Sequence, residues 1–323
     1  MKRFCLSAVI LAAIAVVPAF AGDTYVPSNT PTSGTCNVIP FSGPWPSTNP
    51  TGEWRYQSYQ TAAQLGNTPF RITDISFAPC GSGALTGTDL EVRISHTTVP
   101  ASSTFATNLP SPVTVLKLPT FTYTHTTDTW CPLGLTCPFE YNGTDNLTVE
   151  IRYKNGAITG HSGSCHRDTH TRIYATGAGA YGIATGSMSS AALKIRFTHA
   201  DLTPSNSNPL YGTKVALNLD SSADAGKFYF CASSLNTGSF WLGCWEVQLA
   251  TDNLFLLTIQ NLAPTMFINY QGILDSAGQA KAEVDIPNDH NLVGVAILSS
   301  FAVMGTSGID AVSPNGSFKI SSP

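Results

Sequence analysis

The chain has 323 residues, a formal net charge of −4 and only 11% charged residues. A surface that binds nucleic acid needs clustered Lys and Arg, so this composition argues against nucleic acid as a partner. Ser, Thr, Asn and Gly carry the solubility instead, which is typical of short strands joined by many turns.

Residues 1–21 have the pattern of a secretory signal peptide. Lys2 and Arg3 precede an apolar run over 4–17, and Ala19 and Ala21 form an A-x-A cleavage site. The run is shorter than the roughly 20 residues that span a bilayer. The leader carries two basic and no acidic residues, so its removal changes the net charge from −4 to −6. We expect a secreted protein, extracellular or at the cell surface, with no transmembrane segment.

Residues 22–53 are rich in Pro, Thr, Ser, Gly and Asn. Such a segment lies extended over a surface rather than building a core, so we predict an N-terminal arm. An extended arm can add a strand to the sheet edge of a second copy, and self-association through it is therefore one expected partner interaction.

Residues 54–200 predict a first β-sandwich domain. Leu90, Val92 and Ile94 alternate with Glu91, Arg93 and Ser95, which predicts a strand with one apolar face and one wet face. The same alternation recurs through this part of the chain. The predicted strands cover 72–78, 90–95, 113–118, 121–124, 147–154, 171–175 and 193–198.

Residues 201–210 contain two prolines and no expected core residue, so we predict a linker there. Residues 211–323 then predict a second sandwich. Its strands are expected at 213–219, 227–232, 240–249, 254–259, 266–270, 280–286, 292–304 and 316–320. The predicted fold class is all-β, with two antiparallel β-sandwich domains (jelly-roll or immunoglobulin-like) in tandem.

Seven cysteines follow the leader, and most should pair in an oxidising compartment. Connectivity does not follow from sequence alone. We expect the pairs that are close in sequence to form, and one longer pair to tie the arm down. These pairs are Cys131–Cys137, Cys231–Cys244 and Cys36–Cys80, which leaves Cys165 free or engaged elsewhere.

The densest polar cluster lies in 161–170, where His166, Asp168 and His170 share one parity of an extended chain. Those residue types bind zinc or copper. The spacing matches no standard zinc finger, and we favour a solvated loop with a structural cysteine. A loop Ca²⁺ is a further possibility at Asp220 and Asp224 or within 142–146, although neither matches the twelve-residue calcium loop.

An enzyme is the weakest alternative. The segment 160–164 (GHSGS) lacks the glycine that a nucleophile elbow needs two residues after its serine. It also lacks an upstream His and Asp in a recognisable context. Paired carboxylates for glycoside cleavage cannot be recognised from sequence, because their separation depends on the tertiary fold.

Four tryptophans lie in or beside predicted loops: Trp45, Trp130, Trp241 and Trp245. Aromatic rings there can stack on sugar faces, which would make the protein a carbohydrate-binding module with cell-surface glycan as its partner. Packing in a core or over a disulfide is the competing role, above all for the two that flank Cys244.

Several segments resemble exported, Ser/Thr-rich, two-module β-sandwich proteins of environmental, planctomycete-like bacteria. They are residues 35–41, 72–80, 103–109, 165–167, 272–280 and 286–288. The resemblance covers most of the mature chain, in strand-and-turn patterns. It implies a secreted two-module β protein and no particular reaction.

These patterns lead to one hypothesis and two alternatives. The leading hypothesis is a non-catalytic structural or adhesive protein at the cell surface or in the matrix, without a required cofactor. The first alternative is a carbohydrate-binding module, and the weaker one is a secreted hydrolase or metal-dependent enzyme.

Overall fold

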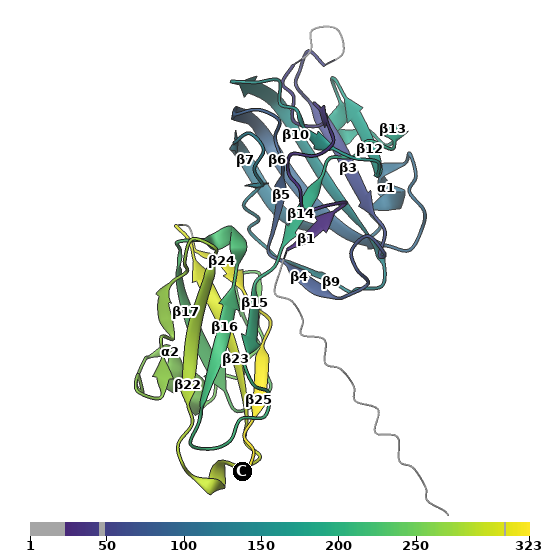
Figure 1. Cartoon of the computed structure of the whole chain (residues 1–323). Helices are drawn as coiled ribbons and strands as arrows, with labels where there is room; N and C mark the ends of the chain where they lie inside the picture. Colours follow the sequence, from purple (N-terminus) through teal and green to yellow (C-terminus); the bar gives the residue numbers. More distant parts are fainter. Residues whose placement is uncertain (1–22, 45–48, 307) are drawn as a thin grey trace, which may run out of the picture.

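The computed structural model describes residues 23–44, 49–306 and 308–323. Over these residues the chain is nearly all β, as predicted, with several antiparallel sheets. Two lobes are visible in Figure 1: an N-terminal lobe (residues 23–199) and a C-terminal lobe (residues 200–323). The predicted signal peptide lies outside the described residues.

The N-terminal lobe is a sandwich of a six-stranded sheet and a four-stranded sheet, joined by two small two-stranded sheets. The six-stranded sheet has the order β13 (Ser187–Ser189), β12 (Thr171–Thr176), β3 (Trp54–Gln60), β10 (Asn146–Thr159), β6 (Gly83–Thr97), β7 (Val113–His125). The four-stranded sheet has the order β1 (Thr24–Val26), β14 (Ile195–Thr198), β5 (Asp74–Phe77), β8 (Cys131–Pro132). The small sheets pair β2 (Thr35–Asn37) with β11 (Cys165–Arg167) and β4 (Phe70–Ile72) with β9 (Phe139–Tyr141).

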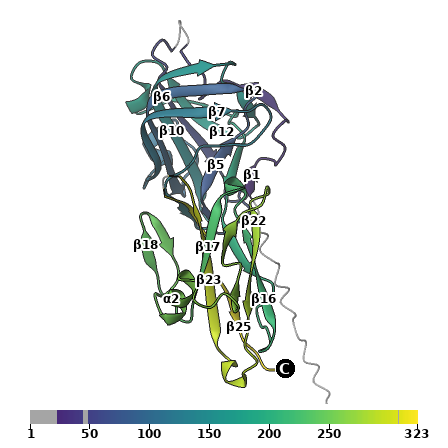
Figure 2. The same ribbon diagram turned by 90° about the vertical axis from the view of Figure 1, so that its left-hand side faces the viewer.

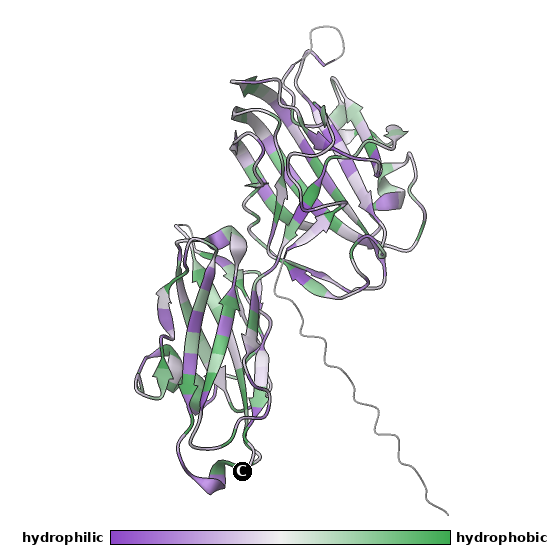
Figure 3. Ribbon diagram, in the orientation of Figure 1, coloured by the Kyte–Doolittle hydropathy of each residue, from purple (hydrophilic) through white to green (hydrophobic). Residues whose placement is uncertain are grey.

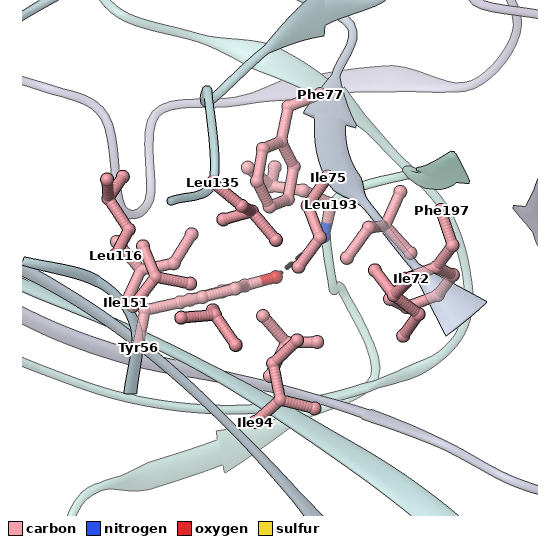
Figure 4. Packing of buried hydrophobic residues seen from close by; sticks show 14 of the residues in the cluster. Tyr56, Ile72, Ile75, Phe77, Ile94, Leu116, Leu135, Ile151, Leu193 and Phe197 are labelled. Carbon is pink, nitrogen blue, oxygen red and sulfur yellow. Dashed lines mark hydrogen bonds between the residues drawn. The ribbon is translucent and has the colours of Figure 1, made fainter. Parts of the chain in front are cut away.

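The core of this lobe lies between its two sheets. Tyr56 from β3 and Ile151 from β10 pack in one cluster with Ile75 and Phe197 from the opposite sheet. Figure 4 shows Tyr56 pointing between the sheets, where its hydroxyl accepts a hydrogen bond of 2.9 Å from the Leu193 amide. Burial raises the pKa of Tyr56 to about 12, so the phenol stays neutral.

The outer face of the six-stranded sheet is not wet, contrary to the prediction for residues 90–95. Glu91 is 7% exposed and Ser95 is fully buried. A short helix, α1 (Phe105–Asn108), and a 3₁₀ turn, η1 (Ala180–Gly182), cover this face. The alternation was predicted correctly, but its polar side carries a second, charged layer under those two elements.

The C-terminal lobe contains two further antiparallel sheets, and its hydropathy alternates along the strands (Figure 3). One has the order β15 (Asp201–Pro204), β16 (Lys214–Asp220), β22 (Gln279–Asp285), β20 (Phe267–Ile268). The other has the order β21 (Gln271–Ile273), β17 (Phe228–Ser234), β23 (Ala296–Met304), β24 (Ile309–Val312), with β25 (Gly316–Lys319) also on β23. The core gathers side chains of β16, β22, β17 and β23. That each lobe is an independent domain stays a prediction.

Three sequence-based assignments in the C-terminal lobe were wrong. Residues 201–204 form β15, paired with β16, and Leu202 is buried, so the predicted linker 201–210 begins as part of the fold. Residues 254–259 lie in a helix, α2 (Asn253–Ile259), instead of a strand. Residues 240–249 form a hairpin of β18 (Phe240–Leu242) and β19 (Trp245–Val247), because Gly243 adopts a positive φ of 66° at the turn.

The predicted arm is built into the N-terminal lobe. β1 pairs with β14 and β2 pairs with β11, and Phe41 is 2% exposed in the core. The Trp54 indole donates a hydrogen bond of 2.9 Å to the Ser42 carbonyl. Residues 23–44 are therefore held by strand pairing within their own lobe. They do not form a free arm.

Two disulfides cross-link the described residues. Cys36–Cys80 forms as predicted and ties β2 to the segment after β5. Cys137–Cys244 replaces the predicted pairs Cys131–Cys137 and Cys231–Cys244, which were wrong. Cys131 and Cys231 are buried and unpaired, whereas Cys244 sits in the β18–β19 turn beside the other lobe. Cys165, the cysteine left unassigned from sequence, is also buried and free.

The two lobes are joined by more than the chain between β14 and β15. The Cys137–Cys244 bond crosses between them, and in Figure 2 the hairpin of β18 reaches toward the N-terminal lobe. Arg71 of β4, 2% exposed, donates hydrogen bonds of 3.1 Å and 3.3 Å to the carbonyls of Glu246 and Val312. Ser222 donates one of 2.8 Å to the Asp23 carboxylate.

Candidate functional site

A groove lies at the open edge of the N-terminal sandwich, where β7 and β8, the edge strands of its two sheets, come together. Its volume is about 400 Å³, which suits a small ligand. Trp130 lies in the connection between these strands and lines the groove with Tyr123, Thr124 and Thr129.

The groove combines aromatic surface with hydroxyl groups. Thr122 and Thr124 are exposed on β7, because they alternate with the buried Phe121 and Tyr123. Trp130 is half-buried, and its ring centroid lies 5.4 Å from that of Tyr25 on β1. Apolar rings beside hydroxyl donors and acceptors are the surface that a sugar ring needs.

The other predicted ligand-binding tryptophans do not join this groove. Trp241 in β18 is 64% exposed on the C-terminal lobe. Trp245 is 2% exposed and packs in the cluster around α2, which confirms a packing role for it. Trp45 lies outside the described residues.

The predicted metal ligands His166, Asp168 and His170 are not brought together. His166 Nε2 donates to Asp128 at 2.8 Å, whereas His170 Nε2 lies 3.4 Å from the Ser58 hydroxyl. Asp168 accepts from the amide and hydroxyl of Thr169. The shared parity fails because residues 168–170 leave the strand after β11 ends at Arg167. The proposed three-residue metal site is therefore wrong.

A different set of ligand-type atoms does gather in the described part of the chain. A ring nitrogen of His166 and the sulfurs of Cys36 and Cys80 all lie within 4.8 Å of one another. Since the two sulfurs are bonded to each other, they offer no thiolate to a metal. Asp128, which holds His166, was not identified from sequence; no spacing rule connects it to a histidine 38 residues away.

In both predicted calcium loops, the side-chain oxygens accept hydrogen bonds from protein groups. Asp224 accepts from Lys227 at 2.8 Å and from Ser221, whereas Asp220 faces Gln279. In the other loop, Asn142 accepts from the amides of Thr144 and Asp145 at 3.0 Å, which is turn chemistry.

The polar residues of the 160–164 segment do not form a nucleophilic pair. Ser162 donates to Ser164 at 3.0 Å, and His161 Nε2 lies 2.6 Å from Nδ1 of His125. Burial and the neighbouring His161 lower the pKa of His125 to about 4, and burial lowers that of His161. Ser58 and His170 are both buried, and His170 Nδ1 has no hydrogen-bond partner among the described residues, which therefore supply no third group of a triad to this contact.

A cavity of about 320 Å³ lies between the lobes and is lined by Asp74, Asp224, Lys227 and Asp310. Asp74 accepts from the amides of Ile75, Gly134 and Leu135, but burial outweighs these bonds and raises the pKa of Asp74 to about 6. Lys227 bonds both other carboxylates, at 2.8 Å and 2.6 Å. The negative charge in this cavity is therefore partly neutralised, by Lys227 and by the raised pKa of Asp74.

A charged layer on the outer face of the six-stranded sheet was also missed from sequence. Glu150 is fully buried and accepts from Arg55 at 2.9 Å, from Gln57 at 2.8 Å and from Arg93. The signal was present, because Glu91-x-Arg93 and Glu150-x-Arg152 place opposite charges at the same parity of two neighbouring strands.

Comparison with known proteins adds no family to these observations. The chain matches no model of a protein family and no curated protein. No helix among the described residues has both the length and the apolar character needed to cross a bilayer.

Proposed function

We propose that the protein is an extracellular, non-catalytic structural or adhesive protein whose two lobes act as one unit. The observation that carries the proposal is the Cys137–Cys244 bond between lobes. A cross-link between lobes stiffens their relative placement, whereas domains joined only by a chain move independently by default. The apolar run over 4–17 and the disulfides support an extracellular location.

The adhesive role is tested with beads that carry the mature protein, released over cells of the producing strain under flow. We expect retention above that of beads coated with an inert protein. Beads that carry the Cys137→Ser/Cys244→Ser variant should be retained less than wild-type beads. Beads that carry the matched Cys36→Ser/Cys80→Ser variant, which keeps the lobes linked, should be retained more than those. Retention no higher than on the inert beads, or cleavage of the matrix during contact, would contradict the proposal.

Carbohydrate binding is the second candidate, and the Trp130 groove favours it. Trp130→Ala removes the groove's largest ring, whereas Trp241→Ala removes an exposed ring on the other lobe. On a glycan array we expect the first change to abolish binding and the second to leave it intact. Equal losses, or no binding by the wild type, would reject this candidate.

Self-association through residues 22–53 stays a prediction. β1 is an edge strand of its sheet, so a second copy would have to pair with its free side. Light scattering of the native material checks it, and a wild-type monomer rejects it. Membership of the exported bacterial β-sandwich proteins likewise stays a prediction.

A further inference from the structure

We propose that Cys36–Cys80 is an exchange-active disulfide that reacts with accessible thiols, and that His166, held by Asp128, is the acid that protonates the departing sulfur. This activity is independent of the adhesive role. It concerns one end of the N-terminal lobe, where β2, β11 and the 126–131 loop meet.

The disulfide is open to attack from one side. Cys36 is an exposed residue and Cys80 is half-buried, so we take Cys36 as the cysteine that an incoming thiolate attacks. Both backbones are fixed: Cys36 lies in β2 directly opposite His166 in β11, and the Cys80 amide donates to the Ser164 carbonyl at 2.9 Å. The sulfurs therefore stay next to the imidazole.

The imidazole is oriented toward a proton-transfer role. Nε2 donates to the Asp128 carboxylate at 2.8 Å, which fixes the orientation of the ring. His166 is 7% exposed, and its Nδ1 is buried without a hydrogen-bond partner in the described part of the chain. A ring nitrogen of His166 lies within 4.8 Å of both sulfurs, which is close enough to transfer a proton to the sulfur that leaves.

The step balances without a further reagent. A thiolate RS⁻ attacks Cys36 Sγ and forms RS–SCys36, while the Cys36–Cys80 bond breaks and its electron pair goes to Cys80 Sγ. The imidazolium of His166 gives a proton to that sulfur. A second thiolate attacking the mixed disulfide releases RSSR and leaves the Cys36 thiolate, so the thiol is oxidised and the protein disulfide reduced.

The second disulfide of the same chain is an internal control. No His, Asp or Glu forms such a three-residue group with Cys137 and Cys244 among the described residues. Glutathione is the probe, and each bond is quantified over time by differential alkylation and mass spectrometry. We expect Cys36–Cys80 to be reduced roughly tenfold faster than Cys137–Cys244, since general acids contribute factors of this size or more.

Variants separate the acid from simple exposure. His166→Gln should slow reduction of Cys36–Cys80 by roughly tenfold and leave Cys137–Cys244 unchanged. Asp128 is a positioning residue with an exposed carboxylate. Asp128→Asn should therefore slow the reduction of Cys36–Cys80 without unfolding the protein, and Asp128→Glu should restore the reduction rate. His290→Gln, a change of a remote exposed histidine, is the matched control.

Two results would overturn the proposal: equal reduction rates for the two disulfides in the wild type, or a Cys36–Cys80 rate that is insensitive to both His166→Gln and Asp128→Asn. If His166→Gln lowers the unfolding temperature, the Asp128 series decides. Failure of the disulfide-exchange proposal would leave the adhesive proposal untouched, because bead retention and disulfide reduction are measured separately.

Discussion

Glu150 has no exposed surface and lies between Arg55 and Arg93 on the covered face of the six-stranded sheet. Arg55 also stacks over Phe105 of α1, with its guanidinium carbon 4.3 Å from the ring centroid. Buried charges are tolerated only when every partner is in place, so this layer specifies how α1 sits on the sheet.

Truncation of Glu150 should therefore be costly. Glu150→Ala leaves the buried Arg55 and the half-buried Arg93 without their shared carboxylate, and we expect a loss of about 3–5 kcal/mol in the free energy of unfolding. Urea titration followed by fluorescence measures it. Asp285→Asn, which breaks the exposed pair with Lys214, should leave the midpoint unchanged. Equal effects of the two changes would show that the layer is not stabilising.

Asp74 should make stability depend on pH. Burial raises its pKa to about 6, above the ordinary value of 3.8. A carboxyl with a raised folded-state pKa contributes stability that is fully present below pH 4 and is lost as the pH rises through 6. Relative to Asp74→Asn, the wild type should gain about 1–3 kcal/mol between pH 7 and pH 4. Urea unfolding of both proteins at each pH checks this, and a constant difference would contradict it.

At the scale of single elements, α2 shows why one sequence prediction failed. The segment 254–259 (LFLLTI) contains β-favouring residues, but Asp252 precedes it as a helix N-cap. Its carboxylate accepts from the amides of Phe255 at 3.0 Å and Leu235 at 2.8 Å. These hydrogen bonds outweigh burial and lower the pKa of Asp252.

Asp252→Ala should destabilise the C-terminal lobe by about 1–2 kcal/mol, because it removes the acceptor of the first-turn amide and of the Leu235 amide. Asp252→Asn keeps an acceptor and should cost less. Hydrogen exchange of the Phe255 amide reports the loss locally. Unchanged protection in Asp252→Ala would mean that packing alone holds α2.

Most strands could be predicted from sequence, because a buried side chain at every second position identifies a strand without knowledge of its partners. The covered outer face could not, since what lies over Glu91 is Tyr181 of η1, which is 90 residues away in the chain. The candidate site was only partly accessible. Trp130 was identified as an aromatic in a loop, but its groove depends on β7 and β8 meeting.

For the whole molecule, the Cys137–Cys244 bond spans 107 residues and joins the lobes. Cross-links over such distances stabilise by about 2–5 kcal/mol, mainly by restricting the unfolded chain. The Cys137→Ser/Cys244→Ser variant should unfold at lower temperature in calorimetry, and its single transition should split into two as the lobes uncouple.

The comparison variant is Cys36→Ser/Cys80→Ser, which removes a bond within the N-terminal lobe alone. It should lower the unfolding temperature of that lobe while the lobes remain cross-linked. If the two variants give indistinguishable calorimetric traces, the junction does not depend on its disulfide.

The buried unpaired thiols of Cys131, Cys165 and Cys231 have a consequence for recovery from heat. While the protein is folded, burial raises the pKa of Cys165 and Cys231, so they stay protonated and unreactive. Once the sheets separate in neutral or alkaline medium, the three free thiols among the described residues can attack the two disulfides there, and the cysteine pairings exchange. Cooling then returns a mixture of isomers, whereas the same cycle in acid returns the native form.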